Sequence, residues 1–524
     1  DNNEENSKAG LSAEASPPPP LPAWLWHPYL IVFISSGCIM ILELVAGRIV
    51  APYVGVSLYT WTTIIGVVLA GISLGNYLGG WLADRWASLR ILGTIFVLAG
   101  IASMGILAVD VLGRLTPGDW PIILEILALV AALFFLPSVI LGTISPIVAK
   151  LAVRDLSRTG RTVGSIYAAG TVGSIVGTFA TGFLLISWLG THVIVWGVAI
   201  LLLALGLIFL LGRRLLLLLL VVLILAGSTA LAASQDWLQG PCTRETNYFC
   251  IKVSAREDDG EVVRVLTLDR LVHSYTSLDD PTKLVYGYEQ MYAEATAYRA
   301  SQDDHLRALF IGGGGYTFPK YMEVVYPGSE LDVIEIDPGV TEVATEYLGL
   351  SRDTKIVSFN EDARIFLERE PAGSYDLVMG DAFNDFSVPY HLTTREFNER
   401  VRAWLADDGL YVVNIVDGPH GRFLRAYLHT LGQTFRHVYL APTIEGWRQT
   451  PRSTFVIIAS DAPLDPIVLK AFDAGDGVPL LARQLLRAEQ VEDILSAGRR
   501  VTLTDHYAPV DQMLAPVFRE EVPR

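Results

Sequence analysis

The chain has 524 residues, which is enough for two or three domains, and its formal net charge is −16. This charge excludes a general nucleic-acid binder, because such a protein needs a basic surface to meet the phosphates. Hydrophobic residues make up 51% of the chain and charged residues only 18%, and the apolar excess lies between residues 28 and 233. That distribution is untypical of a protein that is soluble throughout its length.

Residues 1–27 are polar and then proline-rich, which predicts a disordered lead-in without the basic start of a signal peptide. Residues 28–233 form a predicted transmembrane helical domain of about seven spans, each as long as the roughly 20 residues that cross a bilayer. The apolar segments are 29–50, 59–83, 91–112, 121–149, 164–188, 191–211 and 215–233. The lipid bilayer is therefore one expected partner of the chain.

Small residues recur at every fourth position of the second segment, at Gly71, Gly75 and Gly79. This spacing favours close helix packing in lipid over a transport path. A transport role is kept open by the stretch GNYLGGWLADR, which resembles the loop signature of major-facilitator transporters, and by Glu43 at membrane depth.

Basic residues follow the second, fourth and sixth segments, which places these loops in the cytoplasm and, with seven spans, the C-terminal part outside. Cys242 and Cys250 lie eight residues apart and are either unrelated thiols or a local disulfide, which would need an oxidising compartment. Nucleotide cofactors are made inside the cell and favour the opposite side. We therefore expect a multi-pass protein of the plasma membrane, with the side of the soluble part left open.

Three further parts are expected after the membrane helices. Residues 234–300 predict a small β and helical region with a hairpin around residues 258–260. Residues 301–460 alternate strands with helices, which predicts a Rossmann-like doubly wound α/β domain. Residues 461–524 predict a helical tail, with one helix over 480–498. The chain has no Cys-x-x-Cys spacing and no Cys/His cluster, so we expect no metal.

The stretch FIGGGGY, residues 310–316, ends a predicted strand and precedes a helix that starts near Thr317. Glycines at such a turn let the backbone approach a nucleotide, and Glu335 at the next strand end is placed to accept ribose hydroxyls. Asp362 and Asp381 follow two further strands. Acids on successive strand ends favour a ligand site over helix caps or solvated turns. The glycine spacing disfavours a dinucleotide oxidoreductase.

Three stretches, IGGGGYTFPKY, VIEIDP and DAFNDFSVPYHLTTREF, together resemble the polyamine aminopropyltransferase (spermidine synthase) family, a branch of the class I methyltransferase-like fold. The resemblance covers roughly residues 247–460 and is greatest to members fused to a multi-span membrane region. It implies a transferase that moves an aminopropyl group from decarboxylated S-adenosylmethionine, as a co-substrate, to a small-molecule amine in polyamine biosynthesis.

The resemblance also implies a role for individual residues. Asp381 matches the catalytic aspartate, which would accept the proton of the attacking amine, and Tyr288 matches a tyrosine that would orient the amine. His273 stands where the family has a substrate-binding glutamine. The residues expected to bind the sulfonium nucleoside are Gly312, Gly313, Gly314, Glu335, Asp362 and Ala363.

The chain departs from the family at three places. Gly315 stands where the synthases carry a loop aspartate that holds the aminopropyl amine, and Asn384 replaces a second acid unless Asp385 substitutes for it. Ile444 replaces a substrate tyrosine, for which Glu445 or Trp447 would supply other contacts. Nucleoside recognition thus looks intact, while aminopropyl and diamine recognition differ from the family pattern.

Two other functions stay open beside aminopropyl transfer. One is a methyl or other alkyl transferase that uses S-adenosylmethionine itself on a membrane or exported substrate, since the loss of the loop aspartate would suit the carboxylate of the intact cofactor. The other is a transporter or sensor that binds a polyamine or nucleoside without catalysis. A homodimer is also left open.

Overall fold

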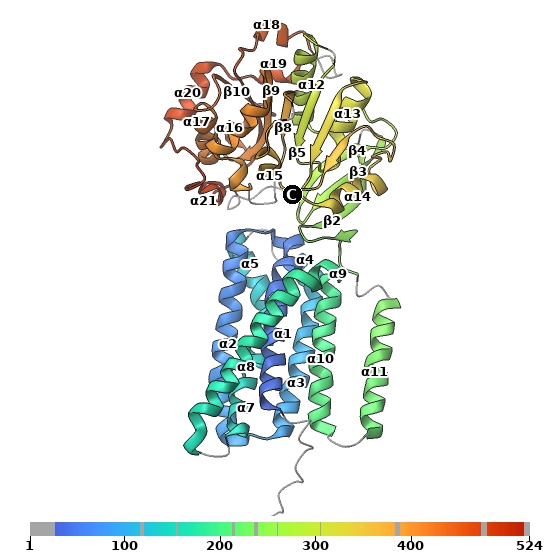
Figure 1. Ribbon diagram of the computed structural model, residues 1–524, viewed down its shortest axis with the longest axis vertical. Coiled ribbons are helices and arrows are strands. Elements are labelled where there is room, and N and C mark those ends of the chain that lie inside the picture. The colour runs from blue at the N-terminus through green and yellow to red at the C-terminus, as the bar shows by residue number, and fades with distance from the viewer. Residues whose placement is uncertain are drawn as a thin grey trace, which may run out of the picture.

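The computed structural model describes residues 27–115, 120–153, 156–211, 215–234, 239–258, 260–303, 305–371, 373–382, 388–472 and 479–517. A bundle of long helices occupies one end of the molecule and an α/β domain the other (Figure 1). The predicted order of a membrane-type bundle followed by an α/β domain is confirmed.

The bundle is built from the apolar segments that the sequence predicts as spans. In the described part of the chain, six helical stretches are long and apolar enough to cross a membrane, by length and composition. They comprise α1 (Pro28–Val54), α2 (Leu58–Trp86), α3 (Leu89–Met104) with α4 (Val109–Leu115), α5 (Ile122–Val130) with α6 (Leu136–Gly142) and α7 (Ile144–Ala152), α8 (Thr159–Ala180) with α9 (Ile186–Trp188), and α10 (Thr191–Leu211). The seventh predicted segment forms α11 (Leu215–Ser234), of which Leu223–Ser234 is counted as a shorter apolar helix, so a seventh span stays a prediction.

Glycines bring the helices of the bundle into backbone contact. A Cβ atom built on Gly75 of α2 would lie 2.2 Å from the Val139 carbonyl oxygen of α6, and one on Gly173 of α8 would lie 2.1 Å from the Phe33 carbonyl oxygen of α1. No larger side chain fits at either place unless the helices separate. The interpretation of the glycine spacing as a packing device is therefore confirmed.

A small antiparallel sheet begins the α/β part. Its strands follow chain order, as β1 (Arg244–Glu245), β2 (Cys250–Asp258), β3 (Glu261–Leu268) and β4 (Leu271–Ser277). Asp258 pairs with Glu261 across the predicted hairpin. The helix α12 (Gly287–Ala300) follows and buries its aromatic residues in the core of the domain.

A seven-stranded sheet forms the centre of the domain, in the order β10-β11-β9-β8-β5-β6-β7. The five strands from β9 to β7 are parallel, and β11 runs antiparallel to both of its neighbours. The strands are β5 (Arg307–Ile311), β6 (Glu330–Ile334), β7 (Val357–Phe359), β8 (Tyr375–Gly380), β9 (Leu405–Asp417), β10 (His437–Pro442) and β11 (Ser453–Ser460). This mostly parallel sheet confirms the Rossmann-like α/β class.

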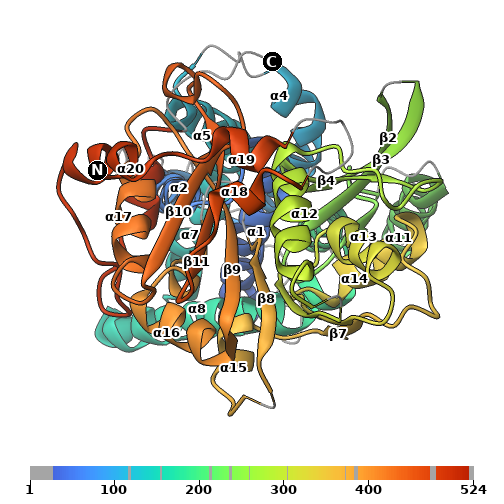
Figure 2. The ribbon, with the colours of Figure 1, turned by 90° about the horizontal axis from the view of Figure 1, so that it is seen from above.

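Helices cover both faces of the sheet (Figure 2). One face carries α12, α13 (Thr317–Val325) and α14 (Pro338–Tyr347), and the other carries α15 (Ala363–Leu367), α16 (Arg395–Trp404) and α17 (Arg422–Leu431). Each face has its own hydrophobic core, because parallel strands that are covered on both sides are apolar on both sides.

The tail differs from its prediction. Instead of one helix over 480–498, the chain forms α19 (Leu480–Gln484) and α20 (Ala488–Ser496), after α18 (Pro466–Leu469) and before α21 (Val510–Leu514). The backbone N–H of Leu486 donates to the Leu440 carbonyl of β10 at 2.8 Å, which takes it out of a helical pattern. Pairing with the sheet edge thus interrupts the apolar helical repeat.

Candidate active site

The functional candidates meet at the carboxyl edge of the parallel strands. Ile311 of β5 is paired with Ile334 of β6 and with Gly380 of β8, so the residues that follow each strand emerge side by side. The Gly312 N–H donates to the Ile334 carbonyl at 2.9 Å, and the Asp381 N–H donates to the Ile311 carbonyl at 3.0 Å. The structure therefore brings the glycine turn, Glu335 and Asp381 together, as expected for strand ends in this kind of sheet.

The glycine turn is shaped by a buried carboxylate. Gly312 has a φ of 98°, and a Cβ atom there would lie 2.6 Å from the Asp381 carbonyl oxygen. One oxygen of Glu335 accepts hydrogen bonds from the N–H groups of Gly313 at 2.8 Å and Gly314 at 3.3 Å, and the other accepts from Asp337 N–H at 3.0 Å. Burial raises the pKa of Glu335, and these three hydrogen bonds act in the opposite direction.

The fourth glycine leaves no room for the aspartate that the family carries there. A Cβ atom on Gly315 would lie 2.0 Å from the Ser274 hydroxyl oxygen and 3.3 Å from that of Thr276. Ser274 is only 3% exposed, and its hydroxyl has no hydrogen-bond partner among the described residues. The Ser274 side chain of the facing strand β4 thus occupies the space that a side chain at position 315 would need.

A cavity of about 360 Å³ extends from the glycine turn to the segment that follows residue 387. Glu335, Asp362, Ala363 and Asp381 line it, together with apolar side chains such as Ile336 and Val388. An apolar cavity with a few convergent polar groups at this edge is the usual form of a small-molecule site.

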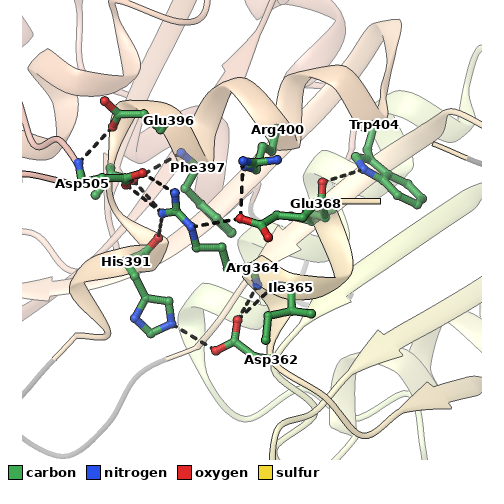
Figure 3. Close-up of polar contacts among 12 residues, drawn as sticks. Asp362, Arg364, Ile365, Glu368, His391, Glu396, Phe397, Arg400, Trp404 and Asp505 are labelled. Atoms are coloured by element: carbon green, nitrogen blue, oxygen red, sulfur yellow. Dashed lines mark hydrogen bonds and ion pairs between the residues drawn. The ribbon is translucent and has the colours of Figure 1, made fainter. Parts of the chain in front are cut away.

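Asp362 serves as a helix cap and as part of the cavity wall at once. One of its oxygens accepts from the N–H groups of Arg364 at 2.8 Å and Ile365 at 3.2 Å, which begins α15. The other oxygen lies 3.2 Å from His391 Nε2 (Figure 3). Asp362 therefore both caps α15 and lines the cavity, so the two interpretations offered by the sequence do not exclude each other.

An ion-paired network holds His391 against Asp362 (Figure 3). The Arg364 guanidinium donates to the His391 carbonyl at 2.8 Å and forms an ion pair with Asp505. The Asp505 N–H donates in turn to Glu396 at 3.1 Å. The C-terminal tail thus fixes one wall of the larger cavity from outside.

A second cavity of about 50 Å³ lies on the other side of Asp381. One oxygen of Asp381 accepts a hydrogen bond from Asn414 Nδ2 at 2.9 Å. Burial raises the pKa of Asp381 to about 6, although hydrogen bonds from Asn414 and Tyr288 favour its charged form. A carboxyl group with this pKa can accept a proton near neutral pH.

Glu289 faces the same small cavity and is 3% exposed. Burial, and then the charge of Asp381, raise the pKa of Glu289 to about 8. The Tyr286 N–H donates to Glu289 at 3.4 Å, so this carboxyl is less well hydrogen-bonded than that of Glu335. Burial, and then the charge of Arg452, lower the pKa of His273 to about 4, so this lining imidazole is neutral at pH 7.

The structure places most of the residues expected from the sequence in these two cavities. Those that line one or both are Tyr288, His273, Gly312, Gly313, Gly314, Glu335, Asp362, Ala363 and Asp381. Glu445 is exposed and Trp447 packs edge-on against Phe455 with ring centroids 5.1 Å apart, and neither is among the residues that line the described cavities. Asp385 and Asn384 lie outside the described residues.

The sequence did not predict every residue of the two cavities and their surroundings. One is Glu289, which follows Tyr288 directly in the chain. The other is Asn414, whose polar side chain within the otherwise apolar end of β9 is the sequence feature that could have indicated it. Asp511, from the C-terminal tail, also lines the larger cavity.

Comparisons with known proteins find polyamine aminopropyltransferases and, over stretches of about 110 to 120 residues, protein methyltransferases. No family model matches the chain. The chain is 36% identical over 110 residues to the polyamine aminopropyltransferase of Vibrio vulnificus, a match that covers 21% of this chain and 37% of that protein. It is 26% identical over 421 residues to polyamine aminopropyltransferase 2 of Streptomyces coelicolor, which covers 76% of this chain and 74% of that protein. A probable spermidine synthase structure from Corynebacterium glutamicum is 24% identical, with a TM-score of 0.43, over 49% of this chain and 93% of that one.

The sheet order and the edge site define an α/β domain of the class I methyltransferase-like type. The chain spans little more than a third of the Vibrio relative and about three quarters of the Streptomyces relative. Over these stretches the chain is similar in sequence to the polyamine aminopropyltransferases.

Replacing Asp381 by a neutral residue should stabilise the protein at high pH and not at low pH. Its pKa in the folded state lies near 6, above the value of about 3.9 for an unfolded chain, so the ionised group opposes folding above pH 6. We expect Asp381→Asn to raise the free energy of unfolding by about 2 kcal/mol at pH 8 and to lose this advantage as the pH falls to 4. Thermal unfolding in detergent across this range measures the effect, and the exposed Asp353→Asn is the control. Equal melting temperatures at pH 8 would contradict the assigned burial cost.

Proposed function

We propose that this protein is a membrane-anchored aminopropyltransferase, which moves the aminopropyl group of decarboxylated S-adenosylmethionine to an amine acceptor. The observation that carries the proposal is the position of Asp381 between two cavities. The larger has the acids at strand ends that suit a nucleoside, and the smaller has a second carboxyl that suits an ammonium group. Similarity to the polyamine aminopropyltransferases of Vibrio vulnificus and Streptomyces coelicolor supports the same activity.

The reaction requires an uncharged amine. Free alkylamines have a pKa near ~10 and are mostly protonated at neutral pH. Asp381 would accept the proton of the amine, and the Tyr288 hydroxyl, which bonds to Asp381, would orient the nitrogen. The nitrogen forms a bond to the carbon next to the sulfonium, the carbon–sulfur bond breaks, and its electron pair stays on sulfur as a neutral thioether.

The small cavity supports the decarboxylated donor over S-adenosylmethionine itself. The aminopropyl end of the decarboxylated donor carries only an ammonium group, and two carboxyl groups, Glu289 and Asp381, line this cavity. The carboxylate of the intact cofactor would instead face the charge of Asp381 in a space with little water. Glu289, which reaches the cavity from α12, would thus replace the loop aspartate for which Gly315 leaves no room.

We also propose that the α/β domain lies on the non-cytoplasmic side of the plasma membrane. The helix α7 lies at the end of the bundle away from the α/β domain (Figure 1). Its last turn carries Lys150, which forms a 3.0 Å ion pair with Asp84, next to Arg85 in the last turn of α2. Positive residues favour the cytoplasmic end of such helices. Cys242 and Cys250 form a disulfide at the other end, which suits an oxidising compartment.

The transferase activity predicts formation of methylthioadenosine. We expect the purified protein to release it from decarboxylated S-adenosylmethionine in the presence of a panel of diamines and polyamines, and Asp381→Asn to lower kcat/KM by about 100-fold or more. The rate should fall as the pH drops below about 6, because protonated Asp381 cannot take the amine proton. Chromatography of the nucleoside products measures both effects. Formation of S-adenosylhomocysteine from S-adenosylmethionine, with no methylthioadenosine from the decarboxylated donor, would establish the methyltransferase alternative instead.

The role of Glu289 predicts a proton-linked donor affinity. Its pKa near 8 in the empty site means that the carboxyl must lose a proton when an ammonium group binds beside it. We expect donor affinity to rise by up to about tenfold per pH unit between 6.5 and 8, and Glu289→Gln to remove this slope and weaken binding. Calorimetry with the decarboxylated donor measures it. Methylthioadenosine, which lacks the aminopropyl group, is the matched control and should bind both proteins equally; a loss of its binding in Glu289→Gln would show general damage to the site.

The proposed orientation predicts which cysteines an impermeant reagent reaches. In a Cys38→Ala background, an impermeant phosphine followed by an impermeant maleimide should label Cys242 and Cys250 in intact cells. A cysteine introduced by Ala87→Cys, between α2 and α3, should be labelled only after the cells are permeabilised. Mass spectrometry reads out the labelled sites, and the reverse pattern would place the α/β domain in the cytoplasm.

A further inference from the structure

One short loop joins the membrane helices to the α/β domain. Arg48, near the end of α1, donates from one nitrogen to the Tyr248 carbonyl and from the other to the Thr246 carbonyl at 2.6 Å. These contacts span about 200 positions in the sequence. A guanidinium that donates to two carbonyls at once fixes the orientation of the loop as well as its distance.

The same loop is tied to two further membrane helices. Thr191, at the start of α10, donates from its N–H and from its hydroxyl to the two oxygens of Glu245, at 2.7 and 3.0 Å. Ser187 of α9 donates to the Asn247 side chain at 3.0 Å. The loop of residues 242–250, which we call the joint loop, therefore follows the arrangement of α1, α9 and α10.

The other side of the joint loop reaches the donor site. The Thr246 hydroxyl donates to one oxygen of Asp337 at 2.5 Å, and the Asp337 N–H donates to Glu335 at 3.0 Å. Glu335 in turn holds the glycine turn through Gly313 N–H at 2.8 Å. Thr246 is also close-packed, because a Cβ atom on Gly339 would lie 2.3 Å from its methyl carbon.

The joint loop contributes directly to the wall of the larger cavity. Tyr248 and Phe249 both line it, and Tyr248 is the residue whose carbonyl Arg48 holds. A disulfide between Cys242 and Cys250 closes the loop into a short ring. Cys250 is further fixed by Asp269, which accepts from its N–H at 2.9 Å.

We propose that Arg48 is a positioning residue for the donor and that the joint loop couples the arrangement of the membrane helices to donor affinity. The inference rests on the proposed function, because it assigns the larger cavity to the nucleoside part of the donor. A helix arrangement that moves Arg48 displaces Tyr248 from the cavity and Thr246 from Asp337. By linkage, a ligand in the cavity equally favours the helix arrangement that keeps Arg48 in place.

The test uses the full chain in detergent or nanodiscs, with methylthioadenosine as the binding probe. We expect Arg48→Gln to raise the Kd of methylthioadenosine about tenfold and the KM of the decarboxylated donor by a similar factor. The kcat at saturating donor should change less than about threefold, because Asp381 and Tyr288 are not touched. Arg48→Lys keeps the positive charge but cannot donate to both carbonyls in the same geometry, so it should restore only part of the affinity for methylthioadenosine. Lys150→Gln, at the far end of the bundle, is the matched control and should leave both values unchanged.

A second variant keeps the inference testable if Arg48→Gln does not fold. Thr246→Val removes the hydrogen bond to Asp337 but keeps the backbone carbonyl at position 246 that accepts from Arg48, so it should also raise the Kd of methylthioadenosine. In the double variant Arg48→Gln/Thr246→Val, the loss of binding free energy should be smaller than the sum of the two single losses. In the wild type, saturating methylthioadenosine should slow reduction of the Cys242–Cys250 disulfide by a thiol reagent. Unchanged Kd in both folded variants, or a reduction rate that does not respond to the probe, would overturn the coupling. Failure of the wild type to bind methylthioadenosine at all would instead overturn the proposed function.

Discussion

The hydrogen bonds from three backbone N–H groups to the Glu335 carboxylate are the interaction on which the donor site depends. They hold the glycine turn on one side and the start of α14 on the other, so the end of β6 and the turn after β5 form one unit. An ionised carboxylate has room for about four acceptor contacts, and three are used by the protein itself. A ribose hydroxyl would complete the set, because it would fill the remaining position without displacing the loop.

Three acids share the site, Glu335 and Glu289 buried and Asp381 half-buried, and they differ in how many hydrogen bonds the protein gives them. Burial raises the pKa of each, and burial is the first cause in every case. Glu335 has three backbone donors and Asp381 has Asn414 and Tyr288, whereas Glu289 has one long hydrogen bond from the Tyr286 N–H and the charge of Lys320 nearby. A buried charge without partners is costly, so the least satisfied carboxyl is the one that gains most from a cationic ligand. This ordering supports the roles proposed above, in which Glu335 holds the nucleoside, Asp381 accepts the proton and Glu289 binds the ammonium group.

The fold and the strand-end residues could be predicted because they follow from periodicity and from the geometry of parallel sheets. Apolar runs of 20 residues, alternating strands and helices, and acids after consecutive strands are all local features of the sequence. Glu289 could not be found this way, since a glutamate on a helix normally indicates the solvent face, and only tertiary packing buries it. Glu445 and Trp447 lie close to Ile444, where the family resemblance expects a substrate tyrosine, but the turn after β10 leaves Glu445 exposed and packs Trp447 against Phe455.

The steric match between Gly315 and Ser274 links the loop change to a strand 41 residues earlier, which no local pattern could reveal. Because Ser274 fills the space of a loop side chain, an acidic group for the donor has to come from another wall, and α12 is the wall that carries one. The same helix carries Tyr288 beside Asp381, so a shift of α12 would move the amine-orienting group and the ammonium-binding group together. In the proposed reaction, proton transfer and donor selection would thus both depend on α12, while Arg48 and the joint loop would act on the nucleoside part of the donor.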